Sequence, residues 1–404
     1  MQSSLRPGQA GEGHQQPQAY APSGIKNFSG VNVKNENYLD SQSQENTSEP
    51  VISKVECEGL WKVFGVRSEE AIAAMQQGRV DRDKIREQFD CVPAVIDVNL
   101  SVASGEIFCI MGLSGSGKST IVRHINRLIE PSRGQVYVDG EDIGKLKPDA
   151  LRHLRATQIG MVFQDRGLLP HRNVRDNVAF ALELRRVKQE RRDEIAEQVL
   201  DLVQLTGWGD LMPDELSGGM QQRVGLARAL AANPDILLMD EPFGALDPLI
   251  RRELQDQFLQ LSANLSKTTI FITHDLDEAI RLGTRIAIMK DGEIVQTGTP
   301  EDIITSPKDD YVEDFVRNIS RLEVVKAHSV MSPVEEYDGE DGKPLNSLAY
   351  ASPETNLGEL IDIIIKRSGA IAIIDDGKPI GVVTLASLLK GIRGSELEKV
   401  ANND

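Results

Sequence analysis

The sequence predicts an α/β protein with a mainly parallel sheet and a helical subdomain, followed by a small α+β domain at the C-terminus. Strand patterns alternate with helix patterns from about residue 95 to residue 295, for example at 106–111 and 135–138, which is typical of parallel sheets. From about residue 165 to residue 228 only helical patterns occur. Residues 321–404 then return to short strands and helices.

Composition and charge limit the possible function classes. The chain has 404 residues, of which 40% are hydrophobic, enough for one large core and a small second domain. A net charge of −17 argues against a nucleic-acid partner, because nucleic-acid-binding proteins need basic surfaces. The cysteines form no CxxC pair, which indicates a reducing cytosol. No signal-peptide core and no long apolar run occur, so we expect a chain that does not itself cross a membrane.

The N-terminal segment, residues 1–53, is rich in Gln, Ser, Asn, Gly and Pro, and we predict that it is disordered. Ordered structure is expected from Lys54, since Val55–Phe64 has a strand pattern that ends in a turn at Gly65. Residues 66–91 are polar and helix-compatible. We interpret them as an insert before the next strand.

The strongest chemical signal is a phosphate-binding loop between a predicted strand and a predicted helix. Its glycines let backbone N–H groups surround phosphate oxygens, and the N-terminus of the following helix favours negative charge. Lys118 is placed to reach the β- and γ-phosphates of a nucleotide, and the Ser119 hydroxyl to bind Mg²⁺. A flexible Gly/Ser turn is the alternative, but it requires neither Lys nor Ser at these offsets. The loop consists of Gly112, Leu113, Ser114, Gly115, Ser116, Gly117, Lys118, Ser119 and Thr120.

A second signal is a pair of carboxylates after an apolar strand pattern. Residues 236–239 are apolar, and Asp240 and Glu241 follow them. Because ligands bind at the carboxyl ends of parallel strands, Asp240 suits the coordination shell of Mg²⁺ and Glu241 suits activation of an attacking water. A strand that simply ends in solvated acids is common, and the phosphate loop upstream is what favours the catalytic interpretation.

A third signal is Ser217-Gly218-Gly219 at the start of a predicted helix. Ser217 is a good N-cap, and the glycines expose backbone N–H groups, which together predict a second anion site. Since the chain already has one phosphate loop, we expect the two sites to meet across a head-to-tail dimer. An ordinary capped helix is the alternative.

Together with Gln164, the segment Ala245-Leu246-Asp247 and His274, these motifs resemble the complete set of the ABC ATPases over residues 54–320. The resemblance implies that Gln164 senses Mg²⁺ and couples to a membrane partner. It also implies that Asp247 organises the dimer contact and that His274 contacts the γ-phosphate of ATP. The catalytic set is then Glu241, His274 and Gln164.

Some positions depart from the family pattern, and at one position two aromatic residues are candidates for the same role. The resemblance implies that Phe64 stacks on the adenine ring, but Trp61 is a second aromatic in the same segment. Met220 stands where the family usually has Gln, yet the phosphate-binding Ser and Gly residues are present, so we expect hydrolysis. Asp165-Arg166-Gly167 replaces the family's usual small residue and aromatic within the expected docking site for the membrane partner, Gln164–His171.

Finer details resemble the ATP-binding subunits of glycine betaine/proline importers. The resemblance implies a homodimer at the cytoplasmic face of the inner membrane, bound to integral-membrane permease subunits and served by a periplasmic or lipid-anchored substrate-binding protein. The function would be ATP-driven uptake of glycine betaine, proline or a related compatible solute in osmoprotection. The segments that carry this resemblance are Asn126–Pro131, Leu169–His171, Leu246–Arg251 and the insert 66–91.

Residues 321–404 resemble a CBS domain, with Gly381–Leu389 as its closing strand and helix. One copy is recognisable, and Val325–Met331 before it resembles a remnant of another. A plain dimerisation domain is the alternative. The acidic stretch Glu335–Asp341 leads to the hypothesis of a regulatory domain that senses ionic strength, since salt screens surface charges. A solvated loop is the other interpretation of that stretch.

Other function classes fit the sequence less well. ABC ATPases that act on nucleic acid or ribosomes carry paired ABC domains or long coiled-coil inserts, and neither occurs in this sequence. A nucleotide sensor would have no use for Glu241 and His274. The insert, the CBS-like domain and the absence of a fused membrane domain disfavour an exporter. We therefore expect an ATPase coupled to transport, with ATP and Mg²⁺ as cofactors and no nucleic-acid partner.

Overall fold

The computed structural model describes residues 53–164, 167–244, 246–317, 319–337, 344–367 and 369–393. They belong to one compact unit, Val51–Asp404, and every element named below lies within it. The predicted disorder of residues 1–53 falls outside the described residues, Ser53 excepted.

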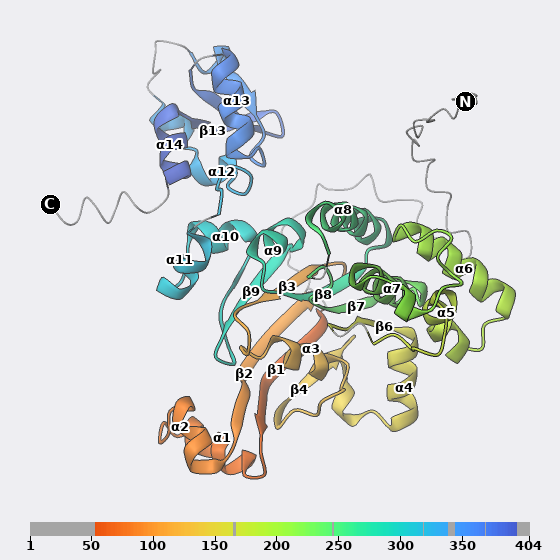
Figure 1. Cartoon of the computed structure of the whole chain (residues 1–404). Coiled ribbons are helices and arrows are strands. Elements are labelled where there is room, and N and C mark those ends of the chain that lie inside the picture. The colour runs from red at the N-terminus through yellow and green to blue at the C-terminus, as the bar shows by residue number, and fades with distance from the viewer. Residues whose placement is uncertain are drawn as a thin grey trace, which may run out of the picture. The chain divides into compact units, whose positions relative to one another are not determined.

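A six-stranded sheet, in the order β10-β9-β3-β8-β7-β6, forms the centre of the main domain (Figure 1). Its strands are β3 Ile107–Met111, β6 Ile159–Val162, β7 Ile236–Asp240, β8 Thr268–Thr273, β9 Arg285–Lys290 and β10 Glu293–Gly298. All neighbours are parallel except the pair β9 and β10, which confirms the predicted parallel sheet for these strands. Strands β3, β7 and β8 are buried throughout, as expected when both faces of a sheet are covered.

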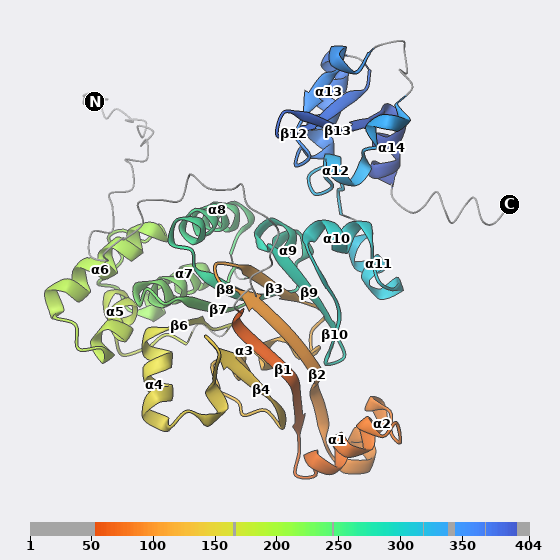
Figure 2. The same cartoon turned by 180° about the vertical axis from the view of Figure 1, so that it is seen from behind.

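Different layers cover the two faces of this sheet (Figures 1 and 2). The helices involved are α3 Lys118–Ile125, α7 Gly218–Ala231, α8 Pro248–Leu265 and α9 Leu276–Leu282. Alternate side chains of β3 point to opposite faces. Cys109 and Met111 pack in the core with α7, α8 and α9, whereas Phe108 and Ile110 pack with α3 and a second sheet.

The second sheet is antiparallel, in the order β2-β1-β4-β5. It contains β1 Ser53–Phe64, β2 Val92–Ala103, β4 Arg133–Val138 and β5 Glu141–Asp142. The prediction that placed residues 135–138 in the parallel sheet is therefore wrong. The long strand β1 pairs with both β2 and β4. The order of elements along the chain does not reveal that β1 is the partner of β4. Alternating burial along β2 is the signal typical of an antiparallel sheet.

The predicted insert forms two helices, α1 Ser68–Gln76 and α2 Arg82–Phe89, between β1 and β2. Their apolar residues Ala71, Ile72 and Ile85 form a small core around Trp61. Trp61 is therefore only 7% exposed, whereas Phe64 is 43% exposed. The insert thus covers Trp61 and leaves Phe64 accessible.

The predicted all-helical stretch is confirmed among its described residues. It contains α5 Val174–Leu184, α6 Gln189–Leu202, a 3₁₀ turn at Pro213–Glu215, and α7, while α4 Pro148–Thr157 lies just before β6. Asn177, fully buried on α5, fastens the loop that follows Gln164: its side chain accepts from Leu169 N at 2.7 Å and donates to Arg172 O at 2.9 Å. The helical region thus shapes the segment at the end of β6.

The C-terminal elements form a small α+β module. They are α12 Ala327–Val330, β11 Ala349–Ala351, α13 Leu357–Arg367, β12 Ile371–Asp375, β13 Lys378–Val383 and α14 Leu385–Arg393, with the sheet order β11-β12-β13. Val325 O accepts from Leu357 N at 3.0 Å, and Ser332 pairs with Val382 of β13. The segment 325–331 therefore belongs to this module and does not form a second copy. The acidic stretch predicted to sense salt lies mostly outside the described residues.

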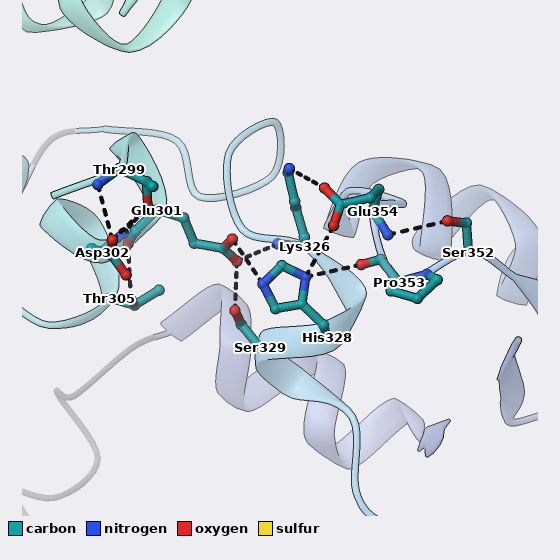
Figure 3. A network of polar contacts seen from close by, with 10 residues as sticks. All are labelled: Thr299, Glu301, Asp302, Thr305, Lys326, His328, Ser329, Ser352, Pro353 and Glu354. Atoms are coloured by element: carbon teal, nitrogen blue, oxygen red, sulfur yellow. Dashed lines mark hydrogen bonds and ion pairs between the residues drawn. The ribbon is translucent and has the colours of Figure 1, made fainter. Parts of the chain in front are cut away.

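Two short helices, α10 Pro300–Thr305 and α11 Asp310–Val316, precede this module. Figure 3 shows that Glu301 of α10 receives several donors from the start of the module. Its Oε1 accepts from Lys326 N at 2.8 Å and from Ser329 Oγ at 2.6 Å, and its Oε2 lies 3.2 Å from His328 Nε2. The Glu301 carboxylate is largely buried and so fixes where the chain enters the module.

Candidate active site

The phosphate loop connects β3 to α3, as predicted, and packs very closely against neighbouring backbone. A Cβ atom on Gly112 would lie 2.1 Å from Met289 O, and one on Gly117 would lie 2.1 Å from Ala94 O. Both glycines also have positive φ, 153° and 104°. Gly115, with φ of 80°, has nothing within 4 Å of its position for a Cβ. The loop therefore packs against neighbouring backbone at Gly112 and Gly117, whereas there is free space beside Gly115.

Lys118 is buried at the start of α3, with its amino group inside the loop. Its Nζ donates to Gly112 O at 2.8 Å and to Leu113 O at 2.9 Å. Burial lowers the pKa of Lys118, and the negative charges of Glu241 and Asp240 oppose that shift. An ammonium group has three donors, so one is left for an anion in the loop.

Ser119 and Asp240 lie in hydrogen-bond contact although they are far apart in the sequence. Ser119 Oγ donates to Asp240 Oδ1 at 2.9 Å, and Arg123 Nη2 lies 4.0 Å from Asp240 Oδ2. Burial raises the pKa of the Asp240 carboxyl, against the effects of Ser119 and Arg123. A bound cation would counteract this rise, because it favours the charged carboxylate.

The donor set fits a magnesium–nucleotide complex. A hydroxyl and a carboxylate are the hard oxygen ligands that Mg²⁺ prefers, and Mg²⁺ usually keeps waters and phosphate oxygens as its other ligands. Within the described part of the chain no group of three His, Cys, Asp or Glu side chains is arranged to hold a metal. Ser116 Oγ is buried and finds no hydrogen-bond partner among the described residues, as expected of a donor directed at a phosphate.

Glu241 follows β7 and meets two side chains from the ends of neighbouring strands. Gln164 Nε2, just beyond β6, donates to Glu241 Oε2 at 3.3 Å. His274 Nδ1, just beyond β8, lies 3.2 Å from Glu241 Oε1. Glu241 has a φ of 50°, and its backbone N–H donates to Ile272 O at 3.1 Å, so β8 holds it in a left-handed conformation. The carboxyl ends of three parallel strands thus bring Gln164, Glu241 and His274 together.

Two other predicted residues are helix caps. Ser217 caps α7, as predicted, and accepts from Met220 N at 3.3 Å, with Gly218 and Gly219 in the first turn of the helix. Asp247 caps α8 and accepts from Ile250 N at 3.1 Å.

Phe64, Ser114 and Thr120 complete the predicted set. Phe64 ends β1, half exposed, with Lys62 Nζ 5.0 Å above its ring. Ser114 is an exposed loop residue, and Thr120 lies in the first turn of α3. No hydrogen bond or ion pair found among the described residues joins Lys118 to Phe64, Ser217 or Asp247.

Sequence reasoning missed a turn that supports the loop. Asp291 and Gly292 connect β9 to β10, and Gly292 N donates to Ser116 O at 3.0 Å. Arg82 of the insert forms an ion pair with Asp291. The Asp-Gly pair between two apolar runs is a hairpin signal visible in the sequence, but its contact with the phosphate loop is not.

Comparisons with known proteins agree with this site. Residues 95–244 match the family model described as ABC transporter, and residues 344–394 match the model of the CBS domain. The ATP-binding cassette MJ0796, solved as a dimer in a post-hydrolysis state bound to ADP and Pi, aligns with a TM-score of 0.53 and 33% identity over 61% of this chain and 98% of that one. The predicted ABC-type fold and CBS domain are confirmed.

Two relatives refine the assignment. The glycine betaine/carnitine transport ATP-binding protein GbuA of Listeria monocytogenes is 41% identical, covering 86% of this chain and 99% of GbuA. The glycine betaine/proline betaine transport system ATP-binding protein ProV of Escherichia coli is 52% identical over 69% of each chain. The chain therefore belongs to the family of ABC transporter ATP-binding proteins.

Proposed function

We propose that this protein is the ATP-hydrolysing subunit of an importer for glycine betaine, proline or a related compatible solute. The observation that carries the proposal is the convergence of Lys118, Ser119, Asp240 and Glu241 at one edge of the parallel sheet. The substrate class is taken from the relatives GbuA and ProV, which are named for glycine betaine transport.

ATP binds in the phosphate loop, with its adenine ring on the exposed face of Phe64 and its phosphates against Lys118 and the loop N–H groups. Ser119, Asp240 and Gln164 would hold Mg²⁺, which would neutralise phosphate charge when bound. The hydrogen bond between Ser119 and Asp240 supports this assignment, because it already places two oxygen ligands side by side.

Glu241 orients and deprotonates the attacking water. Its two carboxylate oxygens are engaged by Gln164 and His274, which fix its direction at the end of β7. His274 is 62% exposed and therefore accessible for a contact with the γ-phosphate. The three residues assigned to the attacking water and the γ-phosphate thus lie at the ends of β6, β7 and β8.

Glu241→Gln is expected to leave ATP binding intact and to reduce turnover by about 10²- to 10⁴-fold, the usual contribution of a positioned base. Uptake of glycine betaine by the transporter reconstituted from this variant and its permease should stop as well. Steady-state hydrolysis and binding of labelled ATP are the measurements. The matched control is Glu293→Gln on the exposed start of β10, which should change neither. Wild-type hydrolysis by the Glu241 variant would remove this residue from the role.

The active form is a homodimer in which Ser217, Gly218 and Gly219 of one subunit complete the phosphate site of the other. Two observations support this. In one chain the described contacts hold Lys118 and Ser217 in separate networks, and the related cassette MJ0796 was solved as a dimer. Ser217 already occupies an N-cap, so the backbone N–H groups of Gly218 and Gly219 face outward from the start of α7.

Mixing the purified Ser217→Arg variant with the purified Lys118→Ala variant tests this arrangement. Each homodimer lacks both functional sites and should be inactive, whereas the mixed dimer regains one intact composite site. We expect hydrolysis to rise on mixing to about a quarter of the wild-type rate, since about half of the dimers are mixed and each has one of two sites. Absence of any gain in a mixture shown by tags to contain heterodimers would contradict the shared site.

The subunit works at the cytoplasmic face of the inner membrane, bound to permease subunits near Gln164–His171, and a substrate-binding protein delivers the cargo. No helix in the described ranges is long and apolar enough to cross a membrane. Asn177 supports the docking site, because it gives the Leu169–Arg172 loop a defined shape. Asp165 and Arg166, the departures from the family pattern, lie outside the described residues.

The C-terminal module, residues 321–404, regulates transport, and loss of an electrostatic contact at high salt is the proposed signal. Truncation after Ser320 should abolish the salt threshold for uptake while leaving the ATPase of the main domain in place. Reconstituted uptake across a salt series compares the truncated protein with the full chain. An unchanged threshold would contradict the salt mechanism and leave dimerisation or ligand binding, for example in the cavity of about 300 Å³ beside Arg367, as the module's role.

A further inference from the structure

Arg251 joins the two turns that follow Glu241 and His274. It lies near the start of α8, and its side chain reaches two oxygen atoms. Its Nη1 donates to Asp275 Oδ2 at 3.2 Å, and its Nη2 donates to Leu246 O at 3.3 Å. The guanidinium group therefore bridges a backbone carbonyl after β7 and a carboxylate after β8.

The Leu246 end of this bridge leads back to Glu241. Leu246 N donates to Phe243 O at 3.2 Å, and Gly244 N donates to Glu241 O at 3.3 Å, so successive turns connect Glu241 to Leu246. Leu246 is only 6% exposed and packs in the main core. The carbonyl that accepts from Arg251 thus belongs to backbone that is anchored in the domain.

The Asp275 end fixes the backbone next to His274. Asp275 N donates to Thr273 Oγ1 at 3.0 Å, and Asp275 Oδ1 accepts from Glu278 N at 3.3 Å as the N-cap of α9. Its other oxygen, Oδ2, accepts from Arg251. Both carboxylate oxygens are therefore engaged, and the turn that carries His274 is held by β8, α9 and α8 together.

Other contacts hold α8 against α9 without Arg251. Gln255 Nε2 donates to Glu278 Oε1 at 3.0 Å, and both side chains are buried. At the surface, Arg281 Nη2 donates to Asp256 Oδ1 at 2.6 Å. Removal of the Arg251 guanidinium should therefore leave the two helices packed and release only the turn at the start of α9.

The placement of Arg251 is not the one that stability alone favours. The side chains of Arg251 and Asp275 are 30% and 36% exposed, so solvent weakens their ion pair. Arg251 Nε is buried and finds no hydrogen-bond partner among the described residues, and a buried donor without a partner lowers stability. These observations favour a role for Arg251 in the reaction.

We propose that Arg251 is a positioning residue for ATP hydrolysis, which keeps His274 beside Glu241 by fixing the turn between β8 and α9. The proposal rests on the function proposed above and gives a role to a side chain that this function leaves unused. His274 Nδ1 lies 3.2 Å from Glu241 Oε1, and this contact requires that the turns behind the two residues keep their separation. Because Arg251 acts on these turns and not on the phosphate loop, it affects the chemical step and not ATP affinity.

Arg251→Met tests the bridge, because it removes the guanidinium group and keeps an unbranched side chain. We expect kcat for ATP to fall by about 3- to 30-fold, the value of a charged hydrogen bond reduced by its partial exposure. The KM for ATP and the Kd of a non-hydrolysable analogue should stay within about 2-fold of the wild type, as for an interaction that serves the transition state. Steady-state kinetics and calorimetry on the full chain are the measurements. A wild-type kcat would contradict the proposal.

A double-mutant cycle with Asp275→Asn separates positioning from a general loss of stability. Asparagine can still accept from Glu278 N as an N-cap, but it carries no charge for Arg251. If Arg251 acts through Asp275, the double variant should have the kcat of Arg251→Met alone. Losses that multiply would overturn the proposal, because they would show that the two residues act independently.

Two further variants keep the outcome clear. Arg281→Met removes the exposed ion pair with Asp256 between the same two helices, and it should match the wild type in kcat and KM. A loss equal to that of Arg251→Met would overturn the specific role of Arg251. Loss of hydrolysis in Glu241→Gln with a wild-type kcat in Arg251→Met would overturn the role of Arg251 alone. Wild-type hydrolysis by Glu241→Gln would overturn the proposed function and the inference with it.

Discussion

The close contact between the phosphate loop and the backbone behind it is the constraint on which the rest of the site depends. Two carbonyl oxygens, from Met289 and Ala94, lie where a side chain on Gly112 or Gly117 would have to be. Because backbone cannot move aside as a flexible side chain can, these positions accept only glycine. The loop therefore takes its shape from the strands that surround it, and Lys118 and Ser119 follow from that shape.

Electrostatics explains why the shape matters. Lys118 and Asp240 are both buried, and burial moves their pKa values in the directions that disfavour their charges. The two residues offset this in part, since each lies near opposite charge. A nucleotide with its cation would bring phosphate to the lysine and positive charge to the aspartate, and so stabilise both charged forms. The protein keeps these groups in place in advance, which reduces the cost of ordering them during binding.

Much of this site was predictable from sequence because its chemistry is local. The loop glycines, Lys118 and Ser119 are contiguous, and Ser217 was predicted as an N-cap from its place directly before Gly218 and Gly219. The antiparallel pairing of β4 with β1 was missed because strand order along the chain does not specify partners. Glu301 was missed for the same reason, since it binds residues far away in the sequence.

The thermal midpoint of Gly117→Ala without nucleotide tests this account most directly. Gly115→Ala is the matched control, because Gly115 also has positive φ but has open space where a Cβ would be. In both variants the alanine must adopt a left-handed conformation, which lowers stability. Only Gly117→Ala must also displace the backbone at Ala94. The account predicts a midpoint at least about 4 °C lower for Gly117→Ala than for Gly115→Ala. Equal midpoints would contradict it, because the glycine would then serve the ligand and not the packing of the loop.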